Sequence, residues 1–243
     1  MQKYYELKTD KGIMRGYFHV PNKDRYPVCI IFHGFTGLHT GTKFSYTTIS
    51  RILEERGIGT IRLDFLGTGD SDLAFKDMTF KDELECAILI LKEVQNMSGI
   101  TDIYLLGHSM GGAIASEVAK LYPNVIKKMC LWAPAFNLSE DIEYLKGKVP
   151  QADYYDHSGF EISDEFVEDI ISRDFYKDLD IYKNKLMIIH GTKDTTVPYK
   201  ISNRYLKLFY HPIFYPIENA SHNYDNLEHI NKVIELTCQF LSE

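Results

Sequence analysis

The most constraining feature of the sequence is a serine flanked by glycines, the pentapeptide GHSMG at residues 107–111. An apolar run leads into it and a run of small residues follows, which predicts a strand, a sharp turn and a helix with Ser109 at the apex. We expect the flanking glycines, which lack a Cβ, to tolerate a crowded and strained backbone. A hydroxyl held at the positive end of a helix can attack a carbonyl carbon. Glycines also close ordinary strand-to-helix turns. A catalytic role for Ser109 therefore requires an acid and then a histidine later in the chain.

Composition and charge limit the partners of the chain. Its 243 residues suffice for one domain with a large core, and we expect a single domain over residues 1–243. The net charge of −7 argues against nucleic acid or an anionic membrane as a partner. We expect a small-molecule ester as the partner, and a homodimer is left open.

The cysteines and the N-terminal sequence bear on location. The four cysteines are isolated, without the spacing of a metal site, so we expect reduced thiols, no metal and no cofactor. The first residues lack a basic-then-apolar signal, and no apolar run approaches the length of a membrane span. A cytoplasmic protein is the expectation.

Apolar runs that suit strands alternate with segments of helical periodicity. The expected strands are residues 2–7, 13–20, 28–32, 59–64, 103–106, 129–133, 186–190 and 213–215, and the expected helices include 44–56 and 79–96. This alternation predicts an α/β protein with a mainly parallel sheet and helices on both faces.

One segment, residues 135–183, interrupts the alternation. It is far longer than a single crossover helix requires, and it is rich in aromatic and acidic residues. We interpret it as an inserted cap subdomain that folds over the sheet edge carrying Ser109. A plain surface excursion is the alternative.

The acid is expected after the strand that follows this insertion, where the chain has GTKD at residues 191–194. A carboxylate on that loop can reach a histidine on the neighbouring loop, which favours Asp194. A turn aspartate is the ordinary alternative. Asp64, at the end of an earlier strand, is the main rival, but it precedes the serine and so breaks the expected order.

The base is expected after the last strand, where His222 lies. Of the other histidines beyond Asp194, His211 precedes that strand and His229 lies in the final helix. A carboxylate behind His222 would fix its tautomer and stabilise the imidazolium formed when it takes the serine proton. The oxyanion hole needs two backbone N–H donors, and we expect them at Phe35 and Met110.

Four motifs in order, HGF at 33–35, GHSMG at 107–111, GTKD at 191–194 and SH at 221–222, resemble the α/β-hydrolase superfamily over nearly the whole chain. The HGFTG loop and the size of the insertion are similar to bacterial cinnamoyl (feruloyl) esterases. That resemblance implies a Ser109, Asp194 and His222 triad, and a cap that binds a phenolic ring. It matches Asp141 to a residue that binds a ring hydroxyl, and we take Tyr154 and Tyr155 as further substrate-binding residues.

The expected function is a serine carboxylester hydrolase that works through an acyl-enzyme, on hydroxycinnamate esters or other small aryl or acyl esters. A monoacylglycerol lipase or acyl thioesterase, a carbon–carbon bond hydrolase, and a ligand-binding protein without turnover are the alternatives. Serine at position 109 argues against dehalogenase and epoxide hydrolase chemistry, which use an aspartate at the elbow.

Overall fold

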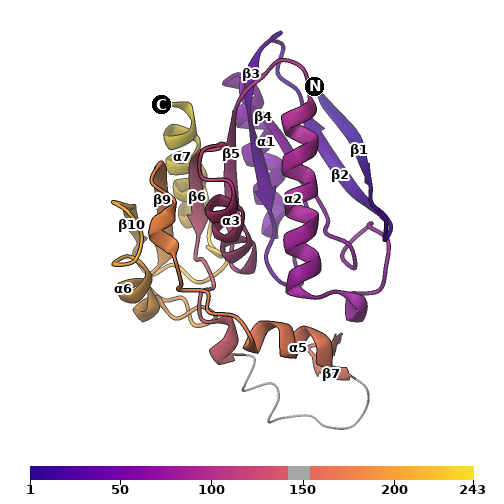
Figure 1. Ribbon diagram of the computed structural model, residues 1–243. Coiled ribbons are helices and arrows are strands. Elements are labelled where there is room, and N and C mark those ends of the chain that lie inside the picture. The colour runs from indigo at the N-terminus through magenta and orange to yellow at the C-terminus, as the bar shows by residue number, and fades with distance from the viewer. Residues whose placement is uncertain (142–153) are drawn as a thin grey trace.

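The computed structural model describes residues 1–141 and 154–243, and its centre is an eight-stranded sheet (Figure 1). The strands are β1 (Gln2–Lys8), β2 (Ile13–His19), β3 (Tyr26–Phe32), β4 (Gly59–Leu63), β5 (Ile100–His108), β6 (Ile126–Trp132), β9 (Lys185–Gly191) and β10 (Ile213–Ile217). Their order is β1-β2-β4-β3-β5-β6-β9-β10. β2 pairs antiparallel with β1 and β4, and the other pairs are parallel, so the predicted sheet is confirmed.

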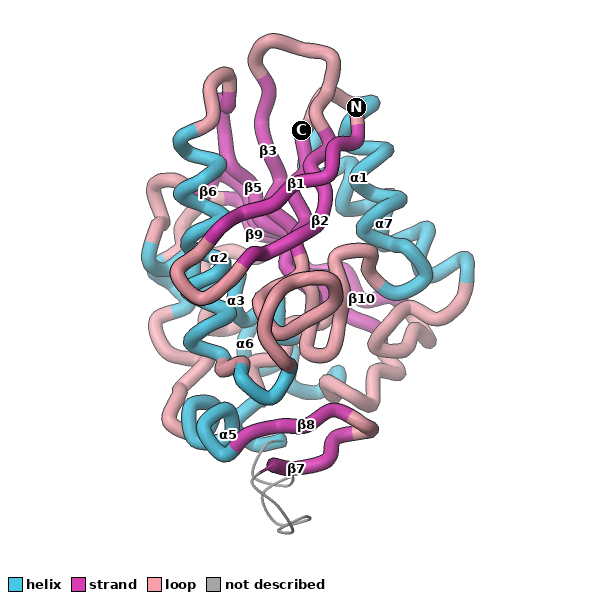
Figure 2. Tube along the Cα trace, turned by 90° about the vertical axis from the view of Figure 1, so that its right-hand side faces the viewer, coloured by secondary structure: helices cyan, strands magenta, loops and turns pink. Residues whose placement is uncertain are grey.

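Helices cover both faces of the sheet, as Figure 2 shows from the side. The longer ones are α1 (Ser45–Glu55), α2 (Phe80–Asn96), α3 (Met110–Leu121) and α7 (Leu227–Ser242). α1 and α7 contact each other on one face, and α2 and α3 contact each other on the opposite face. Short elements connect these parts: α6 (Ser202–Tyr205) and the 3₁₀ turns η1 (Thr42–Phe44), η2 (Phe75–Asp77), η3 (Leu179–Ile181) and η4 (Tyr199–Ile201).

The continuously apolar run in β3 is explained by burial on both faces. Val28 and Ile30 belong to the apolar cluster that includes α2 and α3, whereas Cys29 and Ile31 belong to the cluster that includes α1 and α7. Successive side chains of a strand point to opposite faces, so both registers of this strand must be apolar. The sheet is therefore held by two separate apolar layers.

The segment between β6 and β9 contains a small hairpin, β7 (Tyr154–His157) and β8 (Phe160–Ser163), followed by α5 (Asp164–Ile171). Its aromatic side chains pack on the loops that follow β3 and β4. Phe166 stacks on Phe35 with ring centroids 5.1 Å apart, and Phe160 lies 4.7 Å from Phe75. Residues 142–153 of the predicted cap, and the acidic residues among them, lie outside the described residues.

None of the helices described in the structure is both long and apolar enough to cross a lipid bilayer. All four cysteines lie in the described ranges and are buried free thiols, two in strands and two in helices.

Candidate active site

Ser109 lies between the end of β5 and the start of α3, as the pentapeptide predicted. Its backbone angles are φ 56° and ψ −123°, a conformation that non-glycine residues rarely adopt and that persists only where the surroundings impose it. The surroundings here are hydrogen bonds. The Ser109 N–H donates to the carbonyl of Trp132 at 2.9 Å, and its carbonyl accepts from Ala135 N–H at 3.0 Å.

The glycines around the serine are required for space. A Cβ on Gly107 would lie 2.3 Å from the carbonyl oxygen of Gly111, and a Cβ on Gly111 would lie 2.3 Å from the carbonyl oxygen of Phe32. The sequence led us to expect strained angles at the glycines, but the positive φ of this turn lies on Ser109 itself. The glycines let β5, α3 and β3 approach closely enough to hold the serine in that conformation.

Asp194 and His222 form a hydrogen-bonded pair. β9 and β10 are parallel neighbours, so the loops after them lie side by side at one edge of the sheet. Nδ1 of His222 lies 2.7 Å from Oδ2 of Asp194, and both residues are buried. The other oxygen, Oδ1, accepts the backbone N–H groups of Thr196 at 2.9 Å and Val197 at 2.8 Å.

These contacts define the ionisation state of Asp194. Burial by itself raises the pKa of this carboxyl. The hydrogen bonds that it accepts from His190 and His222 lower the pKa by more than burial raises it, so the pKa lies well below its ordinary value. The group is therefore a carboxylate, which only accepts hydrogen bonds. Nδ1 of His222 must then carry the hydrogen, which leaves Nε2 free to take a proton.

Ser109 and His222 line one cavity of about 410 Å³. Its other lining residues are His33, Gly34, Phe35, Thr36, Gly37, Leu38, Thr40, Gly41, Thr42, Tyr46, His108, His157, Thr196 and Asn223. In the described part of the chain no hydrogen bond joins the Ser109 hydroxyl to the His222 ring; such contacts often form fully only when substrate binds.

The two expected oxyanion donors are available. Phe35 lies in the loop after β3, which touches the serine: a Cβ on Gly34 would be 3.0 Å from Cβ of Ser109. Met110 is the first residue of α3, where backbone N–H groups have no partner inside the helix. Within the described residues, neither the Phe35 nor the Met110 N–H donates a hydrogen bond to another group.

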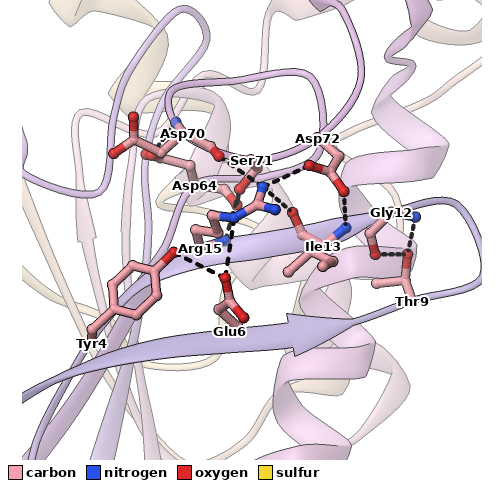
Figure 3. A network of polar contacts seen from close by, with 10 residues as sticks. All are labelled: Tyr4, Glu6, Thr9, Gly12, Ile13, Arg15, Asp64, Asp70, Ser71 and Asp72. Carbon is pink, nitrogen blue, oxygen red and sulfur yellow. Dashed lines mark hydrogen bonds and ion pairs between the residues drawn. The ribbon is translucent and has the colours of Figure 1, made fainter.

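Asp64, the rival acid, pairs with a different histidine. Its carboxylate accepts a hydrogen bond from Nδ1 of His39 at 2.8 Å. It also accepts hydrogen bonds from the backbone N–H groups of His39 at 2.6 Å and Asp70 at 3.1 Å. Figure 3 shows the surrounding network, in which Arg15 of β2 contacts the same loop through Asp72 at 2.6 Å. Asp64 thus ties the loop after β4 to the loop that carries Phe35, and it does not contact His222.

His108 belongs to the site although no signal marks it in the sequence, because it occupies a variable position of the pentapeptide. Its Nε2 lies 3.2 Å from the carbonyl oxygen of His222, so it donates there, and the two rings are 5.0 Å apart. Burial, followed by the nearby charge of His222, lowers the pKa of His108 to about 3. His108 is therefore neutral, and its hydrogen bond holds the backbone carbonyl of His222 in place.

The three expected substrate-binding residues do not line the cavity, as far as the structure describes it. Asp141 accepts a hydrogen bond from the amide of Asn137 at 2.8 Å. Tyr154 is exposed on β7, and the hydroxyl of Tyr155 donates to Asp164 at 2.7 Å. His157, from the same hairpin, does line the cavity. The roles of Asp141, Tyr154 and Tyr155 stay predictions.

Residues 1–141 and 154–243 contain no cluster of three or more His, Cys, Asp or Glu side chains that could hold a metal ion.

Known proteins match this chain in both sequence and structure. Residues 24–154, more than half of the chain, match the model of the α/β-hydrolase family described as "Serine aminopeptidase, S33". The chain belongs to this family. Its mainly parallel sheet carries a serine at the turn after a central strand.

Est1E from Butyrivibrio proteoclasticus, in a structure with ferulic acid bound, is 26% identical, with a TM-score of 0.88 over 98% of this chain and 100% of that one. This match confirms the resemblance to α/β-hydrolase esterases of the cinnamoyl type. Mouse α/β-hydrolase domain-containing protein 10 shares the fold, with 18% identity, a TM-score of 0.79 and coverage of 98% of each chain.

Human protein ABHD12B is 26% identical over 95% of this chain. The aligned region covers 65% of that protein, so the chain spans less than two thirds of its curated relative.

Proposed function

We propose that this member of the serine aminopeptidase S33 family is a carboxylester hydrolase that works through an acyl-enzyme. The observation that carries the proposal is the hydrogen-bonded pair of Asp194 and His222, which lies at the same cavity as a serine in a strained turn. A protein that merely binds esters would need neither feature. The strained turn positions a nucleophile, and the carboxylate stabilises an imidazolium that forms only during reaction.

In the proposed reaction, Oγ of Ser109 attacks the carbonyl carbon of the ester while Nε2 of His222 takes the hydroxyl proton. Asp194 stabilises the resulting imidazolium. The substrate's carbonyl oxygen becomes negatively charged and accepts hydrogen bonds from the backbone N–H groups of Phe35 and Met110. The carbon–oxygen bond to the alcohol then breaks, and the alcohol leaves with the proton held by His222. Water repeats the sequence on the acyl-enzyme and releases the acid.

A small aromatic acyl group is the proposed substrate class, as in esters of hydroxycinnamic acids. Phe35, which borders the cavity, lies in a group of rings formed with Phe75, His157 and Phe166. Flat rings favour offset or edge-to-face contacts with another ring. The likeness to Est1E, which binds ferulic acid, supports the same class.

We also propose that residues 135–183 act as the cap of this site. The packing of Phe166 and His157 on Phe35 supports this role, because it joins the inserted segment to the loop that supplies an oxyanion donor. Asp141, Tyr154 and Tyr155 stay candidates for contacts with the acyl group.

The test is hydrolysis of a panel of esters by the purified protein: methyl ferulate, an aryl acetate, and a long-chain acyl ester presented in detergent. We expect kcat/KM for methyl ferulate to exceed that for the long-chain ester by more than tenfold. Ser109→Ala should lower kcat by several orders of magnitude.

The matched control is Ser116→Ala, a buried serine of α3 whose hydroxyl, among the described residues, bonds to the carbonyl of Gly112 alone. It should retain activity. A preference for the long-chain ester would reject the aromatic substrate class, and hydrolysis that survives Ser109→Ala would reject the serine mechanism.

A further inference from the structure

A second histidine lies behind the acid of the proposed site. His190 is the penultimate residue of β9 and is fully buried. Its Nε2 lies 3.2 Å from Oδ2 of Asp194, the same oxygen that receives Nδ1–H of His222. It also lies 2.9 Å from the carbonyl oxygen of Val197. The proposed reaction assigns no role to this histidine.

The partners of His190 fix its tautomer. The Asp194 carboxylate and the Val197 carbonyl can only accept hydrogen bonds, so Nε2 of His190 must carry a hydrogen that the two acceptors share. On the other side of a neutral ring, Nδ1 is then an acceptor. The hydroxyl of Tyr205, in α6, lies 2.7 Å from Nδ1 and is placed to donate to it.

Tyr205 is suited to this part because it stays protonated. The residue is fully buried, and burial, followed by the charges of Tyr199 and Asp194, raises the pKa of its hydroxyl well above the ordinary value. A buried neutral phenol next to a ring nitrogen donates its hydrogen. The chain of donors therefore runs in one direction, from Tyr205 through His190 to Asp194.

We propose that His190 and Tyr205 are positioning residues of the site. His190 supplies one of the two hydrogen bonds that described residues donate to Oδ2 of Asp194, and Tyr205 orients the His190 ring. Together they set how strongly that oxygen attracts the imidazolium of His222. Neither residue lines the cavity in the described structure, so both act through Asp194. The inference deepens the proposed function and rests on it for its consequence in catalysis.

The expected effect of removing the His190 donor has a definite sign. Oδ1 of Asp194 stays held by the N–H groups of Thr196 and Val197, so the carboxylate keeps its place. Oδ2 then carries more unshared negative charge and stabilises protonated His222 more strongly. The pKa of His222 should rise, and the acidic limb of the profile of kcat/KM against pH should move to higher pH.

Other titratable groups also face Asp194 and His222. His222 faces His108 from the end of β5 and Asp225 from its own loop. Asp194 faces Tyr224 as well as Tyr205. Tyr205 loses Nδ1 of His190 as an acceptor in both His190→Asn and His190→Gln, so the comparison of these two variants reports the lost donor to Asp194.

The test compares His190→Asn with His190→Gln, with the pKa of His222 measured from the NMR signals of its ring nitrogens. A glutamine amide reaches about as far as Nε2 of histidine and can still donate to Asp194, whereas an asparagine amide is too short. We expect an increase of about 0.5 to 1 in the pKa of His222 for His190→Asn, and little change for His190→Gln. Tyr205→Phe should give a smaller increase.

Tyr182→Phe is the matched control, because it also removes a buried hydroxyl but one that donates to the carbonyl of Lys185. It should leave the pKa of His222 unchanged. An unchanged or lowered pKa in His190→Asn would overturn the proposal. If His190→Asn does not fold, the pKa of His222 in Tyr205→Phe tests the proposal, and an unchanged or lowered pKa there would overturn it.

The NMR readout does not need turnover, so the two proposals fail separately. Absence of ester hydrolysis by the parent protein would reject the proposed function. An unchanged pKa of His222 would reject the positioning role.

Discussion

Two buried carboxylates of this chain each pair with a histidine, and their surroundings separate their roles. Asp194 holds His222, which borders the cavity next to Ser109. Asp64 holds His39 and the backbone of two loops. At the scale of single residues, the same pair of residue types therefore serves a proposed reaction in one place and loop geometry in the other.

Asp194→Asn should lower kcat by about 10³-fold to 10⁴-fold, because an amide cannot hold the required tautomer of His222. Asp64→Asn should lower kcat by less than about tenfold, but it should lower the melting temperature, since the amide presents hydrogens to groups that themselves donate. Ester hydrolysis and thermal unfolding of both variants check this. A larger loss of kcat in folded Asp64→Asn would show that the acid is wrongly assigned.

The neutral state of His108 predicts a pH dependence of stability. Its pKa is about 3 in the folded protein, against about 6.5 in an unfolded chain. Between these values the unfolded state binds the extra proton, so the free energy of unfolding falls as the pH is lowered from 6.5, by about 1.4 kcal/mol per pH unit from this group.

His108→Gln removes that proton and keeps a donor for the carbonyl of His222. Denaturant unfolding between pH 6.5 and 4 should therefore show a shallower loss of stability than the parent protein. Equal slopes for the two proteins would mean that His108 is protonated in the folded state.

At the scale of elements, close approach around the turn limits what α3 and β5 tolerate. Gly111→Ala would place a Cβ 2.3 Å from the carbonyl oxygen of Phe32. Backbone cannot yield as a flexible side chain does, so we expect a loss of about 3 kcal/mol or more in the free energy of unfolding.

Gly159→Ala, in the β7–β8 turn, is the comparison. No atom of the described residues lies within 4 Å of its added Cβ, but its φ of +91° disfavours alanine, so a loss of about 1 kcal/mol is expected. Denaturant unfolding of both variants measures the difference, and a Gly111→Ala protein as stable as Gly159→Ala would contradict the packing.

The elements themselves were largely predictable, because their signals are local. The helix expected at 79–96 begins where Thr79 accepts the N–H of Asp82 in a capping box, a pattern visible in the sequence. The strand expected at 28–32 is confirmed within β3. The β7–β8 hairpin was not predicted, since its short strands alternate weakly and their packing on Phe35 and Phe75 depends on distant parts of the chain.

At the scale of the whole molecule, chain order predicted the fold and the proposed triad. Parallel strands bring their carboxyl ends to one edge, so loops after β5, β9 and β10 must meet there. The supporting contacts of His190, Tyr205 and His108 were not predictable. His108–His222 and Tyr205–His190 join residues that are brought together by tertiary packing. His190 precedes Asp194 by four residues, but nothing in the sequence marks its ring as turned toward that carboxylate.

The central claim, that Ser109 is the activated nucleophile of the site, is tested most directly by covalent labelling. The protein is incubated with a fluorophosphonate, and the modified peptide is identified by mass mapping. The account predicts one label per chain, on Ser109, absent from Ser109→Ala and much slower in Asp194→Asn. A label on another serine, or equal labelling of Ser109→Ala, would contradict it.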